Sequence, residues 1–258
     1  MTASPKVSVV IPAYRCADTV TEAIDSALAQ DVPLEIILVD DCPDAPVSAV
    51  IQRYLKDGRL RYIQNKRNLG AAASRNIGVS MAQAPYVAFL DADDRWCPGK
   101  LKKQLAAMEQ HQTVLCCTGR QLLSPDGTPS GRWIGVKESI SYRELLKHNS
   151  IGCSSVVISA DVAREFPMEH ADSHEDYILW LKILQKYGFA CGINEPLLQY
   201  RLSNTGKSGS KLHSAKMTFR VYRYMGFGMI KSLLCFCSYA LHGVGKYLFT
   251  KKETKESP

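Results

Sequence analysis

Short apolar runs alternate with helical patterns through the first 120 residues of the chain. Five runs have the length and β-branched content of buried strands: 7–11, 34–39, 60–63, 86–90 and 114–118. The segments between them carry apolar residues at helical spacing, at 20–29, 47–55, 70–84 and 98–111. This alternation predicts an α/β fold, in which a mostly parallel sheet is flanked by helices on both faces.

The pattern loosens after residue 120, where 124–127 reads as a turn. We expect two further strands, at 155–159 and 197–201, and two further helices, at 174–187 and 216–249. A chain of 258 residues suits one domain with an appendage. We therefore predict a domain over residues 1–210, followed by a basic, aromatic-rich helical extension and a polar tail over 211–258.

The positive charge is concentrated in the last quarter of the chain. Residues 201–258 hold eleven Lys/Arg and two Asp/Glu, a net charge of +9, whereas the first 200 residues hold 21 and 23, a net of −2. Such asymmetry indicates a polyanionic partner, either a membrane or a nucleic acid. Because aromatic residues are interleaved with the cations, we favour an anionic membrane surface and expect no nucleic acid. The alternative is an amphipathic helix that packs on the domain or in a dimer interface.

The location of the protein follows from three further sequence features. No window of 18 uncharged apolar residues is present, so we expect peripheral contact with a membrane and not a span. The nine cysteines are scattered without a C-x-x-C pair, which favours a reducing compartment. The N-terminus has no secretory character. We therefore expect a cytoplasmic protein at the inner face of the cell membrane.

Three carboxylates follow the buried run at 85–90, in Asp91-Ala92-Asp93-Asp94. They repel one another, and each is costly to desolvate unless a cation or hydrogen bonds compensate. A hard divalent cation such as Mg²⁺ or Mn²⁺ suits them, especially one that also holds substrate phosphates. The carboxyl end of a strand in an open α/β sheet is also where ligands bind. The alternative is a turn with solvated acids.

Six sequence pieces occur in a fixed order over about residues 5 to 210: Val7-Ser8-Val9-Val10-Ile11-Pro12-Ala13-Tyr14, Val39-Asp40-Asp41, Asn68-Leu69-Gly70 with Ser74-Arg75-Asn76, Phe89-Leu90-Asp91-Ala92-Asp93-Asp94-Arg95-Trp96-x-Pro98, Glu175-Asp176-Tyr177, and Tyr200-Arg201. Together they resemble the family-two, inverting glycosyltransferases with the GT-A fold. Within that family the chain is similar to bacterial enzymes that build lipopolysaccharide O-antigen or capsule. The resemblance implies a UDP-sugar donor and a saccharide acceptor, expected to be lipid-linked.

The resemblance also implies which residues bind the donor. Asp41 would accept a hydrogen bond from the uracil ring, although a turn cap is the structural alternative. Pro12, Ala13 and Tyr14 would line the pocket for the base and ribose. Arg75 would reach the nucleotide or its phosphates, the alternative being an exposed helix arginine. The other positions implied in nucleotide-sugar binding are Asn68, Gly70, Asp91, Ala92, Arg201 and Lys207.

Two acidic sites are assigned to chemistry by the same resemblance. Asp93 would be the main ligand of Mg²⁺ or Mn²⁺, and Asp91 would contact the metal or the ribose. Glu175 and Asp176 would hold the catalytic base, for which we favour Asp176. Ser173-x-x-Asp176 also fits a helix capping box, which is the structural alternative.

The loop after Arg201 would close over the diphosphate in such an enzyme. Many relatives carry a histidine two residues after this arginine, where this chain has Ser203, so we expect Lys207 to supply charge to the phosphates. A nucleotidyltransferase is the main alternative function, but it calls for a Gly-rich, Lys-bearing loop where the chain has Pro12-Ala13-Tyr14-Arg15. A receiver-type signalling domain would leave the acidic sites unexplained. A nucleic-acid-binding protein would use the basic tail, whose aromatic residues fit an interfacial membrane helix at least as well.

Overall fold

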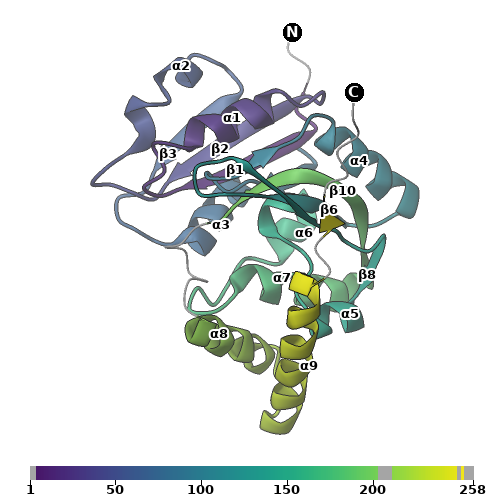
Figure 1. Cartoon of the computed structure of the whole chain (residues 1–258). Coiled ribbons are helices and arrows are strands. Elements are labelled where there is room, and N and C mark those ends of the chain that lie inside the picture. Colours follow the sequence, from purple (N-terminus) through teal and green to yellow (C-terminus); the bar gives the residue numbers. More distant parts are fainter. Residues whose placement is uncertain (1–3, 203–210, 249–250, 253–258) are drawn as a thin grey trace.

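The computed structural model describes residues 4–202, 211–248 and 251–252, and its centre is one β-sheet with helices on both faces (Figure 1). Four strands form its N-terminal half in the order β3–β2–β1–β4, all parallel: β1 (Val7–Ala13), β2 (Leu34–Asp40), β3 (Leu60–Gln64) and β4 (Tyr86–Phe89). This half agrees with the predicted strands to within a few residues. The predicted α/β class is therefore confirmed.

The other half of the sheet mixes strand directions. β9 (Val157–Ser159) runs antiparallel between β4 and β6 (Leu115–Leu123), and the long β10 (Phe189–Arg201) pairs with β6 in parallel. Short antiparallel strands complete it: β5 (Arg95–Trp96), β7 (Pro129–Ile134), β8 (Ser139–Ser141) and β11 (Lys251–Lys252). The hairpin turn between β6 and β7 lies where the sequence predicts it, with Gly127 at φ +86°.

Two apolar clusters lie on opposite faces of the sheet, because alternate strand residues point to opposite sides. Val9 and Ile36 belong to the cluster beneath α1 (Val20–Leu28), α2 (Gln52–Leu55) and α4 (Lys100–His111). Val10 and Ile37 belong to the other cluster, which faces α3 (Ala71–Met81), α6 (Ala160–Glu165) and α7 (Glu175–Tyr187). The largest fully buried side chain, Trp180 of α7, packs there with its ring centroid 6.2 Å from that of Phe89.

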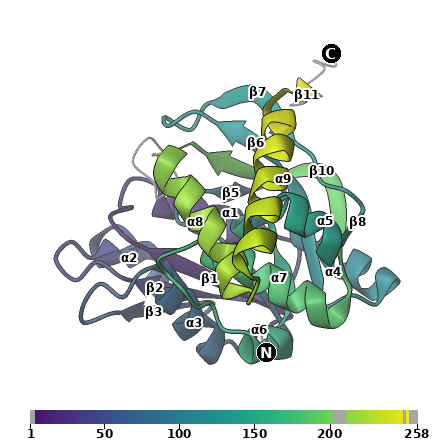
Figure 2. The same cartoon turned by 90° about the horizontal axis from the view of Figure 1, so that it is seen from below.

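The C-terminal segment forms two helices, α8 (Lys211–Tyr224) and α9 (Met229–Leu248), which lie below α7 in Figure 1 and side by side in Figure 2. The sequence predicts a single helix over 216–249. It breaks because Gly226 adopts φ +78°, a left-handed conformation that ends α8. Val221 and Tyr222 of α8 are fully buried against the rest of the fold. None of the described helices is long and apolar enough to cross a membrane.

Several short elements carry no periodic signal that sequence reasoning could use. The helix expected at 47–55 is a 3₁₀ turn (Val47–Ala49) followed by the single turn of α2. Also unpredicted are β5, β7, β8, α6, and α5 (Tyr142–Lys147) with its capping box at Ser141 and Glu144. Each is too short for its hydrophobic period to be recognised.

One lysine lies wholly inside the protein. Lys100, at the start of α4, has no exposed surface, and its Nζ donates to Gln104 Oε1 at 2.6 Å and lies 4.3 Å from the ring centroid of Trp96. Gln104 in turn donates to the carbonyl oxygens of Cys116 and Ser155, both at 2.9 Å. Burial lowers the pKa of Lys100 from its usual 10.5 to about 7, because the charged ammonium group is kept out of water. No carboxylate among the described residues lies within 4.0 Å to offset this effect.

We predict that this lysine makes the stability of the fold depend on pH. Between pH 7 and 9 the unfolded chain keeps the Lys100 proton that the folded chain releases, so this residue makes the free energy of unfolding rise with pH, by up to about 1.4 kcal/mol per pH unit. Lys100→Met removes that term, so its stability relative to the wild type should fall as pH rises. Urea unfolding at pH 6, 7, 8 and 9 measures the difference.

Below pH 7 the lysine is charged in both states, so the difference should level off there. The thiols that face Nζ belong to Cys97, Cys116 and Cys117, and they remain in the variant. Parallel stability–pH curves for the two proteins would show that Lys100 keeps its proton in the folded state.

Candidate active site

The carboxyl ends of β1, β2 and β4 bring the predicted donor residues to one edge of the sheet. Ala13 at the end of β1 pairs with Asp40 at the end of β2, and the backbone N–H of Asp41 donates to Ala13 O at 2.7 Å. Tyr14, directly after β1, is half exposed, while Ala13 is buried. The acid loop, residues 91–94, follows β4 at the same edge. Ligands bind at this edge in open α/β sheets.

Asp41 organises the loop that precedes α3. Its carboxylate accepts hydrogen bonds from Asn65 Nδ2 (2.8 Å) and from the backbone N–H groups of Leu69 (2.8 Å) and Gly70 (2.7 Å). Asn68 Nδ2 donates to the backbone carbonyl of Asp41 at 3.2 Å. The structure therefore brings together three residues that are predicted to bind the nucleotide sugar, Asp41, Asn68 and Gly70. The buried Asp41 carboxylate, however, faces the loop that carries the other two. Its contact with uracil stays a prediction.

The acid loop divides its carboxylates between the interior and the surface. Asp94 is buried; its Oδ1 accepts the backbone N–H of Arg201 at 3.0 Å, and its Oδ2 has no hydrogen-bond partner in the described part of the chain. Asp91 and Asp93 are only partly buried. Burial raises the pKa of Asp93, and the neighbouring charge of Asp91 adds to the rise. Two partly open, mutually repelling carboxylates favour a cation between them.

Arg75 of α3 ties the acid loop to α7. Its guanidinium, 8% exposed, donates to Asp91 Oδ1 at 2.6 Å and lies 3.5 Å from Glu175 Oε1. The two carboxylates raise the pKa of Arg75 well above its usual value despite the opposing effect of burial. The alternative of an exposed helix arginine is wrong, since the side chain is buried in a bridge between two acids. Its contact with the nucleotide or its phosphates stays a prediction.

Glu175 and Asp176 form the first turn of α7, next to Arg75. The capping box suggested by the sequence is absent: the N-cap residue is His174, and Ser173 Oγ instead donates to Met217 O at 2.8 Å. Asp176 Oδ1 accepts the backbone N–H of Tyr177 at 2.7 Å. Burial, and then the charge of Glu175, raise the pKa of Asp176. A carboxyl whose pKa moves up toward neutrality is suited to proton transfer.

Arg201 is a second arginine that holds the acid loop. Its Nε donates to Asp93 O at 3.0 Å, and its NH2 donates to Glu22 Oε2 of α1 at 2.8 Å. The same Glu22 oxygen lies 3.2 Å from NH1 of Arg95. In this structure the Arg201 side chain is therefore bound to other protein groups, and the Tyr200-Arg201 motif positions the acid loop. A contact between Arg201 and the diphosphate stays a prediction.

Some site residues were missed by the sequence reasoning, and some predicted ones cannot be placed. Glu22 has no signal in the sequence, because it is one acid on an ordinary amphipathic helix. Ser154, whose Oγ accepts the Asp91 backbone N–H at 3.0 Å, lies in the 3₁₀ turn Cys153–Ser155. Lys207 and the loop 203–210 lie outside the described residues.

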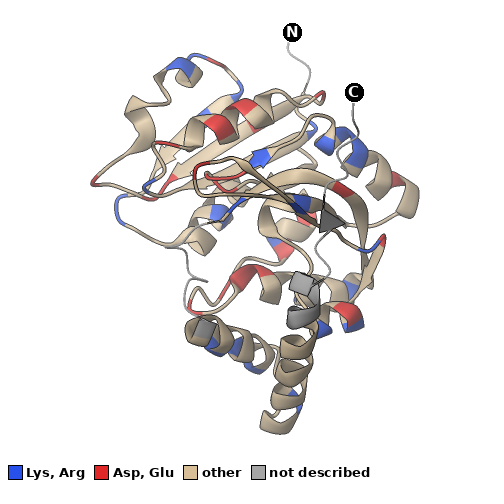
Figure 3. Ribbon diagram, viewed as in Figure 1, with Lys and Arg blue, Asp and Glu red and all other residues tan. Residues whose placement is uncertain are grey.

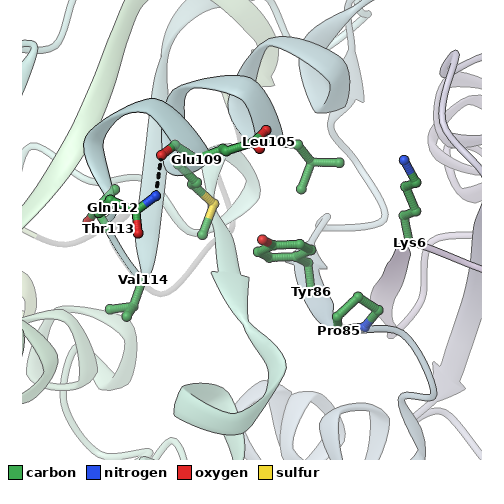
Figure 4. Close-up of a pocket in the computed structure, with 9 residues that line it drawn as sticks. Lys6, Pro85, Tyr86, Leu105, Glu109, Gln112, Thr113 and Val114 are labelled. Carbon is green, nitrogen blue, oxygen red and sulfur yellow. Dashed lines mark hydrogen bonds between the residues drawn. The ribbon is translucent and has the colours of Figure 1, made fainter.

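A large pocket of about 590 Å³ lies elsewhere, at the opposite edge of the sheet (Figure 4). Lys6, Tyr86 and Val114 line it, next to or at the amino ends of β1, β4 and β6, together with residues near the end of α4. The acids follow the carboxyl ends of β2 and β4. This pocket is therefore separate from the acid site and carries none of the predicted residues.

Comparison with known proteins agrees with the site and the fold. The sequence model described as "Glycosyl transferase family 2" matches residues 8–159. A Bacillus subtilis (strain 168) relative, named putative teichuronic acid biosynthesis glycosyltransferase TuaG, is 38% identical over 95% of this chain and 98% of its own length. The Escherichia coli UDP-Glc:alpha-D-GlcNAc-diphosphoundecaprenol beta-1,3-glucosyltransferase WfaP is 31% identical over 97% of this chain and 99% of its own.

Solved structures share the fold at low sequence identity. The S. aureus TarS fragment 1–349 in complex with UDP-GlcNAc has a TM-score of 0.69 at 18% identity, over 84% of this chain and 65% of that one. The mannosyltransferase PcManGT from Pyrobaculum calidifontis, in complex with GDP-Man and Mn²⁺, has a TM-score of 0.66 at 17% identity, over 88% and 66%. With the family match over most of the N-terminal sheet and full-length relatives above 30% identity, this chain belongs to glycosyl transferase family 2 and has the GT-A fold.

Proposed function

We propose that this enzyme transfers a sugar from a UDP-sugar to a lipid-linked saccharide during synthesis of a bacterial surface polysaccharide, with inversion at the anomeric carbon. The observation that carries the proposal is the Arg75 bridge, which sets the acid loop beside Glu175 and Asp176. A donor site and a base are then adjacent, as a direct displacement requires. The UDP-GlcNAc complex of TarS supports the choice of a UDP-sugar as donor. The name of WfaP, a transferase that acts on a diphosphoundecaprenol-linked sugar, supports the choice of a lipid-linked acceptor.

The donor nucleotide would lie across the ends of β1 and β2. Pro12, Ala13 and Tyr14 would line the base and ribose pocket, and the half-exposed ring of Tyr14 is available for contact. Asp41, which fixes the loop carrying Asn68 and Gly70, would orient the uracil either through its remaining acceptor capacity or through that loop.

Asp93 and Asp91 fit a divalent cation that is shared with the donor. Among the described residues, no group of three His, Cys, Asp or Glu side chains is placed to hold a metal alone. Two carboxylates are enough for Mg²⁺ or Mn²⁺ when phosphate oxygens and water complete the coordination. A bound cation would neutralise the charge that grows on the β-phosphate as UDP leaves. Because Asp91 already binds Arg75, Asp93 would be the main ligand.

Asp176 would act as the base, and its neighbour Glu175 would be held in place by Arg75. The acceptor hydroxyl oxygen attacks the anomeric carbon, the bond from that carbon to the β-phosphate oxygen breaks, and the hydroxyl proton passes to the Asp176 carboxylate. Glu175 is buried and paired with Arg75, so it is held in place and is less accessible to an acceptor than Asp176. The rise in the pKa of Asp176 makes it a stronger base at working pH.

The outer face of α9 would attach the enzyme to the membrane that presents the acceptor. Its large apolar side chains are between 54% and 79% exposed: Met229, Ile230, Leu233, Leu234 and Leu241. They follow helical spacing along one side of the helix. Residues 211–248 contain Lys and Arg but no Asp or Glu, and α8 is lined with blue in Figure 3. Apolar side chains in the headgroup region and cations against anionic lipid give peripheral attachment, at the inner face of the cell membrane.

The first prediction tests the donor and the metal. UDP with Mn²⁺ should raise the melting temperature of the wild type by roughly 5–10 °C at about 100 times the dissociation constant, whereas ATP should not. Asp93→Asn removes a metal ligand at constant volume, so the gain that depends on Mn²⁺ should disappear, as it should in EDTA. Thermal melts measure both, with the exposed Asp161→Asn as the control. Full stabilisation of Asp93→Asn would refute the metal assignment.

The second prediction tests the base. Asp176→Asn should lower turnover by roughly 100-fold or more, the usual scale for loss of a general base. Its affinity for UDP should stay that of the wild type, because the base contacts the acceptor. Single-turnover assays of UDP release measure the rate, again with Asp161→Asn as the control. A dead Glu175→Gln beside an active Asp176→Asn would reverse the assignment within the pair.

The third prediction tests membrane attachment. Deleting the C-terminal helices would expose the core that Val221 and Tyr222 cover, so point substitutions are the cleaner test. Ile230→Glu with Leu234→Glu should abolish co-sedimentation with phosphatidylglycerol vesicles, and salt should weaken the binding of the wild type. Leu55→Glu, at an exposed position on α2, is the matched control. Wild-type protein that stays in the supernatant at low salt would rule out attachment.

A further inference from the structure

Arg120 of β6 is a partly buried cation that has no carboxylate partner among the described residues. Four other arginines in the described residues are buried or partly buried, and each has a carboxylate oxygen within 3.2 Å: Arg61 with Glu35, Arg75 with Asp91, and Arg95 and Arg201 with Glu22. No described carboxylate lies within 4.0 Å of Arg120; its one described side-chain partner is the ring of Tyr200. Because taking a guanidinium out of water is costly, such a cation calls for an anion.

The surroundings of Arg120 place it beside the acid site. A Cβ atom at Gly152 would lie 2.4 Å from Arg120 NH1, so the guanidinium rests against this glycine. Gly152 precedes the turn that carries Cys153 and Ser154, and Ser154 binds the Asp91 backbone. Burial raises the pKa of the Cys153 thiol, the charge of Arg75 lowers it, and the charges of Asp91 and Asp176 add to the rise.

Tyr200 connects Arg120 to the acid loop. The guanidinium carbon lies 5.7 Å from the Tyr200 ring centroid, and the two side chains belong to paired strands, since Arg120 is opposite Leu198 in the β6–β10 register. Burial raises the pKa of Tyr200 to about 12, with Asp94, Asp91 and Asp93 contributing. Tyr200 as a whole is still 39% exposed. Arg120 and Tyr200 therefore form a wall of the site that a ligand can reach.

We propose that Arg120, supported by Tyr200, binds a phosphate of the acceptor, so that the enzyme selects a saccharide carrying a diphosphate. The inference rests on the proposed function and names the acceptor class for the same site. The strand order β6–β9–β4–β1–β2–β3 puts Arg120 two strands from the acid loop, on the side away from the proposed nucleotide pocket. A cation there meets the acceptor and not the donor.

The chemistry of the two side chains fits a phosphate. The planar guanidinium offers paired N–H donors that match two phosphate oxygens, and lysine cannot reproduce this geometry. The cation–π contact with Tyr200 restricts the guanidinium and would limit the entropy lost on binding. A saccharide diphosphate held here would lie beside Gly152, next to the turn whose Ser154 binds the acid loop.

The test uses two synthetic probes that differ only in the phosphates: N-acetylglucosamine joined to a short alkyl chain through an α-linked diphosphate, and the same sugar as a plain alkyl glycoside. Calorimetry on the full chain with UDP and Mn²⁺ bound gives both affinities. Wild type should bind the diphosphate probe at least about 10-fold tighter than the glycoside, the scale for charge-assisted hydrogen bonds. Arg120→Gln should remove this preference, and Arg120→Lys should restore only part of it.

Two further variants keep the outcome interpretable. Gly152→Ala suits the backbone, which has φ −85°, and displaces the guanidinium without removing it; it should also lose the preference, even if Arg120→Gln fails to fold. Arg143→Gln, an exposed arginine on α5, is the control and should keep the preference.

The proposal is overturned if wild type binds both probes equally or binds neither of them. It is also overturned if the Arg120→Gln and Gly152→Ala variants both keep the preference. Weaker UDP binding in Arg120→Gln, with the preference intact, would instead assign Arg120 to the donor. Stabilisation of the wild type by UDP and Mn²⁺ in the same samples separates these outcomes from failure of the proposed function.

Discussion

The bridge that Arg75 makes between Asp91 and Glu175 is the interaction on which the site depends. It joins the loop after β4 to the first turn of α7, two segments that come from different halves of the sheet. A buried charge that loses its partner is strongly destabilising, by about 3–5 kcal/mol. Here the arginine compensates two carboxylates at once, so neither the acid loop nor the start of α7 can move without leaving a charge uncompensated. The spacing between the acid loop and the Glu175–Asp176 turn, the proposed donor site and base, is thereby fixed before any substrate binds.

Arg201 provides the second fixed point of the acid loop. Its backbone N–H binds Asp94 and its side chain reaches Glu22 of α1, so the loop is held from the first helix as well as from β10. Glu22 serves Arg95 and Arg201 together. Asp94 is turned inward by this arrangement, which leaves Asp91 and Asp93 as the acids that face solvent. A preorganised pair of carboxylates loses little entropy when a ligand arrives.

The sequence could predict those features that arise from local patterns and strand ends. The strands of the N-terminal half are continuous apolar runs, and the acids directly after β2 and β4 had to meet at one edge because parallel strands end together. The partners of those acids were beyond reach. Nothing in the sequence around Glu22 distinguishes it from a solvated helix residue, and Arg75 looks the same whether its helix face is exposed or buried. A charge inside a largely buried strand, as at Arg120 in β6, is a signal that could have been read.

Among the described residues, the arginines around the site divide into those bound to a carboxylate and Arg120, which is not, and this division underlies the selectivity that we propose. Arg75, Arg95 and Arg201 are each bound to a protein carboxylate, so the positive charge they carry is already compensated. Neutralising the donor diphosphate would then fall to a cation held at Asp91 and Asp93, while Arg120 remains for a second anion on the acceptor side. An enzyme built in this way would separate its two substrates by the kind of positive charge each one meets. In the arrangement we propose, a metal ion would bind the phosphates that depart, and the Arg120 guanidinium would bind those that stay attached to the acceptor saccharide.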